Sequence, residues 1–250
     1  EANYSKEIVF GEFHNKTKNY FSGPKSELPE ESGGWCDYMV ELEFFKSMPE
    51  GIRKGAWFLT KVTMTGQERN PETGRYPLLN WDDPATNQKH PYWKKNIESS
   101  DWVFNYDDGY YETKGISSAS GKTRMIFRYA DILLLYAEAV AYGTKSIDDL
   151  AFDCMWRVQE RAGVPLISKD VTKEYFQKAV LDERRWETAG MEHSCMGRFF
   201  TMQRHEILHL QKNYRDAAEL SLNPNLTLSE EFYYFPIPDN ELLIVPGLKD

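Results

Sequence analysis

The pattern of apolar and polar positions divides the chain into a helical stretch, residues 127–211, and two less regular parts around it. The segment FRYADILLLYAEAVAYG, residues 127–143, is apolar on nearly every side and ends at a glycine suited to terminate a helix. Such a helix is expected to be buried among other helices. Segments 147–163 and 173–190 show helical spacing of apolar residues, and both also end at glycine.

A fourth helix is predicted from Met196 to Gln211. Ser146 and Asp149 have the spacing of a capping box for the second helix. Four helices joined by short turns predict a mainly α fold of stacked antiparallel helix pairs, which resembles the architecture of tetratricopeptide repeats. The helical-repeat core is therefore assigned to residues 127–211.

Residues 1–126 are expected to form a loop-rich region with few short strands, packed on the helices. KEIVFGEFH alternates like a strand, and YMVELEFFKSM is suited to a short helix. The remaining long loops are rich in aromatic residues, and long loops in compact domains are usually functional or packed on other structure. Residues 212–250 contain prolines that forbid a long helix, so an extended tail is predicted.

Composition excludes several classes of protein. The net charge of -9 argues against nucleic acid, because phosphate binding needs a basic face. No apolar run reaches the ~18 residues that a membrane helix needs. The odd number of cysteines, 3, gives no disulfide framework. The chain opens without a signal-peptide pattern, so any export signal is expected to have been removed or to lie upstream.

The stretch HEILH, residues 205–209, matches the H-E-x-x-H signature of zinc peptidases. On one helix His205 and His209 share a face, and Glu206 would be the general base. A third ligand is missing, because the extended motif would need glycine at Lys212 and histidine at Arg215. We therefore expect no zinc site, with packing of the apolar residues as the alternative role.

Other chemistry signals are weak. The acidic loops NWDDPATN and NYDDGYY lack the alternating ligand spacing of a calcium loop, which favours turns. The sequence has no G-x-S-x-G, P-loop or dinucleotide fingerprint. We expect a protein that is not an enzyme and has no cofactor and no metal.

One string, RYADILLLYAEA (Arg128–Ala139), resembles the hallmark helix of the SusD/RagB family of outer-membrane glycan-binding lipoproteins. Further matches follow in the family's order: WRVQERAGVP, LDERRWETAGMEH, RFFTMQR and the closing FPIPDNELLIVPGLKD. The resemblance covers nearly the whole chain but only the C-terminal part of a family member. It implies a single SusD-type domain that lacks its N-terminal half.

The resemblance also implies a function. Family members bind oligosaccharide or polysaccharide and pass it to a SusC-like TonB-dependent outer-membrane transporter. They lie on the extracellular face of the outer membrane and contact the membrane only through a lipid anchor, which this chain does not contain. A helical-repeat scaffold that binds only protein is the alternative, and a zinc metallopeptidase is a remote one.

The turn with Glu183, Arg184, Arg185 and Glu187 is rich in charge. Two interpretations stay open for it: a solvated face, or pairing with Arg128 and Asp131 or with Arg157 and Arg161. Arg128 and Asp131 are themselves close enough on a helix to pair.

Aromatic residues in polar surroundings supply the candidate binding site. The faces of sugar rings stack on aromatic planes, and sugar hydroxyls bond to nearby polar groups. Two or three of seven aromatic residues in the loops are expected to be exposed platforms: Trp35, Tyr38, Trp81, Tyr92, Trp93, Trp102 and Tyr106. The candidate glycan-binding residues are Trp35, Tyr38, Trp81, Asp83, Asn87, Tyr92, Trp93 and Trp102.

Overall fold

The computed structural model describes residues 6–15, 17, 21–22, 24–95, 102–105, 107–113, 119–190, 196–210, 215–222, 237–245 and 247. The chain divides into two compact units, Glu1–Arg198 and Phe199–Asp250, which are described separately. The boundary falls inside the fourth predicted helix.

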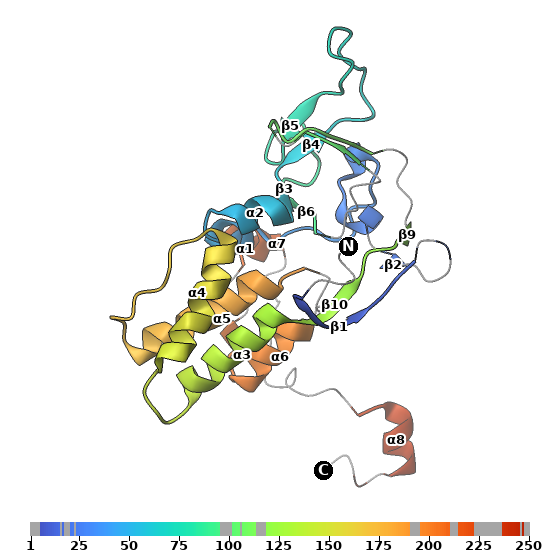
Figure 1. Cartoon of the computed structure of the whole chain (residues 1–250). Helices are drawn as coiled ribbons and strands as arrows, with labels where there is room; N and C mark the ends of the chain where they lie inside the picture. The colour runs from blue at the N-terminus through green and yellow to red at the C-terminus, as the bar shows by residue number, and fades with distance from the viewer. Residues whose placement is uncertain are drawn as a thin grey trace. The chain divides into compact units, whose positions relative to one another are not determined.

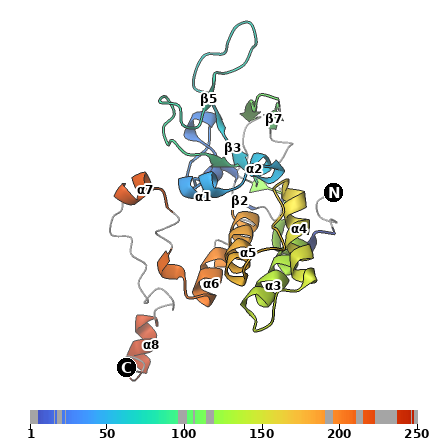
Figure 2. The ribbon, with the colours of Figure 1, turned by 90° about the vertical axis from the view of Figure 1, so that its left-hand side faces the viewer.

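Three helices form the centre of the first unit: α3 (Tyr129–Tyr142), α4 (Asp149–Ala162) and α5 (Lys173–Thr188). They lie side by side, with α3 in contact with both α4 and α5 (Figures 1 and 2). Small residues on α3, Ala130, Ala137 and Ala141, let the neighbouring helices approach closely. The mainly α fold with adjacent helix pairs is the one that the sequence predicts.

The expectation that α3 is buried on all sides is wrong. Its inward face, with Leu134 fully buried, packs in the core with Phe152, Met155 and Phe176. The opposite face leaves Ile132 45% exposed. Because α4 and α5 cover one side of α3, apolar residues remain on the other.

Local signals set the helix ends. The Asp148 carboxylate accepts a hydrogen bond from the backbone N–H of Ala151, so Asp148 caps α4 in place of the predicted Ser146 and Asp149 pair. Asp148 takes this role because it has the extended backbone of an N-cap, whereas Asp149 is already helical. Gly163 ends α4 in the left-handed region, with φ 68°.

The loop-rich part of this unit is built on antiparallel two-stranded pairs in the described residues. The pair that leads into α3 joins β1 (Ile8–Glu12) to β10 (Arg124–Arg128), and β1 confirms the strand predicted within KEIVFGEFH. The other pairs are β2 (Phe21–Ser22) with β9 (Ala119–Ser120), β3 (Phe58–Leu59) with β6 (Tyr92–Trp93), β4 (Lys61–Thr63) with β5 (Leu78–Asn80), and β7 (Trp102–Phe104) with β8 (Tyr111–Thr113).

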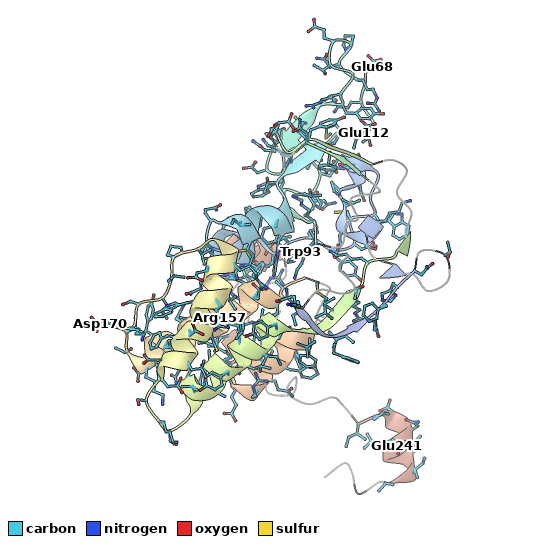
Figure 3. All side chains as sticks on the ribbon, viewed as in Figure 1. Glu68, Trp93, Glu112, Arg157, Asp170 and Glu241 are labelled. Atoms are coloured by element: carbon cyan, nitrogen blue, oxygen red, sulfur yellow. The ribbon has the colours of Figure 1, made fainter. Side chains whose placement is uncertain are left out.

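Short helices complete this part: η2 (Pro24–Glu27), η3 (Glu30–Ser32), α1 (Leu42–Ser47) and α2 (Ile52–Trp57). α1 confirms the short helix expected within YMVELEFFKSM. Two hydrophobic clusters fill the space between these elements. The second cluster includes Phe58, and Trp93, labelled in Figure 3, packs against it. Trp186 of α5 packs against the same cluster, so the loop-rich part contacts the helices.

A buried ion cluster joins α2, α4 and α5 to Arg128, the last residue of β10. Glu187 of α5 lies 3.0 Å from Arg53, 3.2 Å from Arg128 and 2.6 Å from Arg161, measured between carboxylate oxygen and guanidinium nitrogen. Arg53 also lies 2.5 Å from Glu183, and both side chains are almost fully buried. The charge-rich turn is therefore paired and buried at these positions, which decides between the two interpretations of the sequence.

In the same turn, Arg184 forms an ion pair with Glu138 of α3 at 3.0 Å. Outside the turn, Arg128 pairs with Asp131 at 3.8 Å, as their helical spacing predicts. Arg157 takes no part, because it pairs with Asp153 on its own helix.

Helix α6 (Met196–Arg204) crosses the boundary between the units, and α7 (Ala217–Leu222) and α8 (Asp239–Ile244) lie in the second unit. The prediction of an extended tail is wrong at α7 and α8. Pro238 immediately precedes α8, where proline is tolerated because the first helical turn does not need its N–H. Among the described residues, no helix combines the length and apolarity that crossing a bilayer requires.

Candidate functional site

A well-anchored strip, residues 34–40, presents two of the predicted aromatic residues. The backbone N–H of Trp35 donates to Lys25 O at 2.7 Å, and that of Tyr38 donates to Ser26 O at 3.0 Å. Gly34 is required here, because a Cβ at this position would lie 2.2 Å from the carbonyl oxygen of Leu28. The strip is therefore fixed by main-chain bonds, which hold its side chains without needing their packing.

Trp35 and Tyr38 are each 50% exposed, and Met39 beside them is 39% exposed. The ammonium of Lys25 lies over the Trp35 ring, 5.4 Å from its centroid. Lys25 was not among the predicted site residues, since it lies ten residues before Trp35 and no local pattern links the two. Half-exposed rings on a fixed backbone are suited to stacking on a flat apolar face of a ligand.

Asn87 is brought to the same neighbourhood. Its backbone N–H donates to the Glu31 carboxylate at 2.6 Å, and Glu31 belongs to η3, just before the strip. Asn87 is exposed. Asp83 has a different role: its carboxylate accepts from Ala85 N–H at 2.9 Å and so caps the turn that carries Asn87.

The prediction that Tyr92 belongs to the glycan-binding surface is wrong, because its side chain is fully buried. It pairs with Leu59 across β3 and β6 and packs with Leu28 and Val62. Burial raises the pKa of the Tyr92 hydroxyl, and burial also raises the pKa of the neighbouring Cys36 thiol to about 11. The Cys36 side chain is thus a neutral thiol at physiological pH and a poor nucleophile.

The remaining predicted tryptophans take part in packing. Trp81 meets Phe45 edge-on, with ring centroids 5.8 Å apart, and Trp93 packs on Phe58 at 5.3 Å. Both keep part of their surface exposed, so their contact with a ligand stays a prediction. For Trp102 the structure describes the strand but not the side chain, and Tyr106 lies outside the described residues.

Comparison with known protein families shows which family this chain belongs to. The model of the SusD family matches residues 6–250 of this chain. The chain belongs to the SusD family. This confirms the resemblance that the RYAD helix and the later motifs suggest. A comparison with curated proteins gave no match.

Solved structures share the fold of this SusD-family chain. A SusD superfamily protein from Parabacteroides distasonis matches 96% of this chain at 17% identity, with a TM-score of 0.67 over 48% of its own length. Surface glycan-binding protein A from Bacteroides uniformis matches 98% at 17% identity, with a TM-score of 0.59 over 48% of its length. The chain therefore spans about half the length of these relatives.

A third match is surface glycan-binding protein A from Bacteroides thetaiotaomicron in complex with laminarihexaose. It matches 96% of this chain at 18% identity, with a TM-score of 0.57 over 50% of its own length. At these identities the likenesses show a common fold.

In this SusD-family chain the HEILH stretch is not one continuous helix, contrary to the prediction. α6 ends at Arg204, and Glu206 has φ 56°, in the left-handed region. The geometry that places two zinc ligands one helical turn apart is thus interrupted between them. Within the described residues, no group of three or more His, Cys, Asp or Glu side chains is placed to hold a metal ion.

We predict that the purified chain carries no stoichiometric zinc at His205 and His209. The broken helix and the missing third ligand remove the closed coordination that a zinc site needs. Elemental analysis after dialysis checks this. Zinc at one equivalent that is lost in His205→Ala would contradict it.

Proposed function

We propose that this chain is a non-catalytic, surface glycan-binding protein that needs no cofactor. The observation that carries the proposal is the exposure of Trp35 and Tyr38 on a fixed strip of a SusD-family chain. Two matching structures are named surface glycan-binding protein, and one holds laminarihexaose. The proposed ligand is an oligosaccharide or polysaccharide.

The binding chemistry follows from the two rings and their surroundings. Lys25 stands over one face of Trp35, so the sugar would stack on the other face. Asn87, with an exposed amide that both donates and accepts, would bond to sugar hydroxyls. Trp81 and Trp93 would extend the surface through the parts of their side chains that stay exposed, and Trp102 stays a candidate from the sequence.

The proposal extends to transport. A lipid anchor, as in other members of the family, would hold the protein on the extracellular face of the outer membrane. It would pass bound glycan to a SusC-like TonB-dependent transporter. This part rests on family membership, and the acidic net charge of -9 argues against nucleic acid as a partner.

Trp35→Ala and Tyr38→Ala are each expected to weaken glycan affinity roughly threefold to tenfold, the value of one stacked ring. Affinity electrophoresis through gels that contain different polysaccharides measures this, with melting temperature recorded in parallel. Phe10→Ala is the matched control, because Phe10 is an exposed ring on β1. Equal retardation of the parent and of both variants would contradict the proposed surface.

One observation favours the protein-binding alternative. β1, β10 and α3 leave large apolar side chains exposed, from 59% for Phe10 to 46% for Phe127 and 45% for Ile132. Exposed apolar patches are typical of protein contacts. Under this alternative, Phe10→Ser would abolish binding to a partner protein, and Trp35→Ala would have no effect on any ligand.

A further inference from the structure

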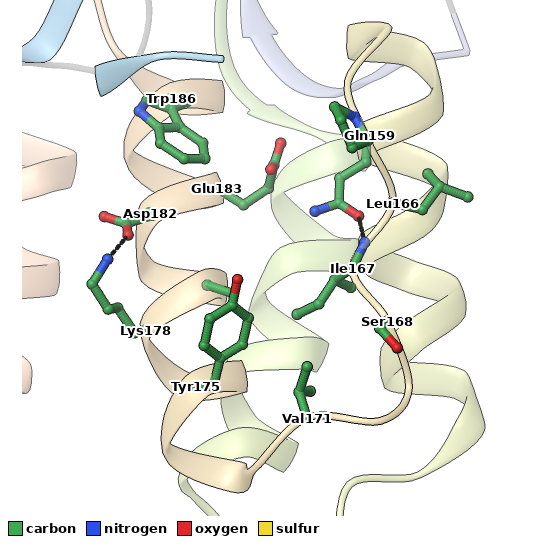
Figure 4. A pocket seen from close by; sticks show the side chains of 12 residues that line it. Gln159, Leu166, Ile167, Ser168, Val171, Tyr175, Lys178, Asp182, Glu183 and Trp186 are labelled. Atoms are coloured by element: carbon green, nitrogen blue, oxygen red, sulfur yellow. Dashed lines mark hydrogen bonds and ion pairs between the residues drawn. The ribbon is translucent and has the colours of Figure 1, made fainter. Parts of the chain in front are cut away.

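A pocket lies in the helical part of the first unit, and no residue of the strip 34–40 lines it. A pocket of about 380 Å³ opens between α5 and the segment that joins α4 to α5 (Figure 4). Its volume lies within the usual range for small-molecule sites, ~300–1,000 Å³. The α5 side of the pocket is formed by Tyr175, Lys178, Ala179, Asp182, Glu183 and Trp186.

Two aromatic rings bound the pocket along α5. Tyr175 and Trp186 are eleven residues apart on one helix face, a separation of ~16 Å along the axis. Figure 4 shows the six-membered ring of Trp186 turned towards Glu183 and the Tyr175 hydroxyl pointing along the helix between the two walls. Ala179 lies between them on the same face, and its small side chain leaves the space open.

The opposite wall is held in place before any ligand arrives. The Trp156 indole N–H donates to Ile167 O at 2.8 Å, and Ile167 N–H donates to the Gln159 side-chain oxygen at 2.9 Å. Two side chains of α4 thus fix the linker at Ile167. A preformed wall lowers the entropy that binding would cost.

The charges around the pocket are already paired. Lys178 lies 2.6 Å from Asp182, and Glu183 lies 2.5 Å from Arg53, which approaches from outside the pocket lining. An anionic or cationic ligand would have to compete with these pairs. The pocket therefore favours a neutral ligand.

Both apolar and polar side chains line the pocket. Leu166, Ile167 and Val171 supply an aliphatic wall. Two groups beside it can bind hydroxyls. The Tyr175 side chain is 59% exposed, and the Asp182 carboxylate, which pairs with Lys178 and lies 3.6 Å from Arg185, has further lone pairs that can accept hydrogen bonds. A neutral ring with an apolar face and hydroxyl edges matches this lining.

We propose that this pocket is a second carbohydrate site, which takes sugar rings of a neutral oligosaccharide between Tyr175 and Trp186. The proposal rests on glycan binding as the function, and it adds a site on the helices to the surface at Trp35. Two separated sites on one chain would bind a long glycan more tightly than either site alone, because the second contact becomes intramolecular.

The test is calorimetric titration of the parent chain with laminarihexaose and with a panel of neutral oligosaccharides. The parent is expected to bind two equivalents of at least one of them. Tyr175→Ala is expected to weaken one of the two equivalents roughly threefold to tenfold. Ala179→Trp fills the pocket and is expected to remove that equivalent, and Tyr129→Ala on α3 is the matched control.

The outcomes separate the two proposals. If Tyr175→Ala and Ala179→Trp bind both equivalents like the parent, the pocket site is overturned and the strip at Trp35 is unaffected. If Ala179→Trp unfolds the chain, Tyr175→Ala alone tests the pocket site, because the Tyr175 side chain is 59% exposed and its removal should leave the fold intact. If only the pocket variants lose binding, the pocket stands and the Trp35 surface is overturned. A folded parent that binds no member of the panel overturns both.

Discussion

Replacing Arg53 with methionine is expected to lower the free energy of unfolding by about 3–5 kcal/mol. The change leaves the carboxylates of Glu183 and Glu187 buried without the guanidinium that lies 2.5 and 3.0 Å from them. An uncompensated buried charge costs more than the pair contributes. Urea denaturation of the parent and the variant measures the difference.

The matched control is Arg157→Met. Arg157 forms an ion pair with Asp153 at 2.9 Å, but both side chains are about half exposed. Such surface pairs contribute little. If Arg53→Met unfolds at the same urea concentration as Arg157→Met, the buried cluster does not stabilise the fold.

The cost of Arg53→Met should depend on pH. Burial raises the pKa of Glu183 above its ordinary value of 4.5, while Arg53 opposes the rise. Without Arg53 the folded-state pKa is higher still, so the folded protein holds this proton more tightly than the unfolded chain. The stability that this proton gives is full below pH 4.5 and is lost as pH rises through the folded pKa. The deficit of the variant should therefore be smaller at pH 4.5 than at neutral pH.

Leu134→Ala is expected to destabilise the chain by about 2–5 kcal/mol, the usual cost of a cavity in a packed core. Leu134 is fully buried at the contact of α3 with its neighbours. Leu150→Ala makes the same chemical change at a position that is 52% exposed, and its cost should be below about 1 kcal/mol. Equal losses in the two variants would contradict the assignment of α3 to the core.

Local signals in the sequence were sufficient to place the three long helices of the first unit, α3, α4 and α5. Gly163 ends α4 because glycine adopts the left-handed conformation without steric cost. Such a local signal is absent after α6. Glu206, a residue with no preference for the left-handed conformation, takes φ 56°, so the helix does not continue to Gln211 as the sequence predicts. A non-glycine residue in this conformation has no signature that a sequence pattern reveals.

The candidate site depended on contacts between distant segments. Trp35 and Tyr92 both stand among polar or turn-forming neighbours, yet Trp35 is half exposed and Tyr92 is fully buried. The difference arises from pairing of Tyr92 with Leu59, 33 residues earlier in the chain. The α5 pocket was missed for the same reason, because Tyr175 and Trp186 lie in an ordinary amphipathic helix and only the linker folded over them makes a cavity.

The most direct test of glycan binding is a tryptophan-fluorescence titration of the folded chain with neutral polysaccharides and oligosaccharides, laminarihexaose among them. Binding that saturates is expected for at least one ligand, and the double variant Trp35→Ala/Tyr38→Ala should bind that ligand at least about tenfold more weakly. A chain with a normal melting transition that binds none of them, or a double variant that binds as tightly as the parent, would contradict the proposed function of this surface.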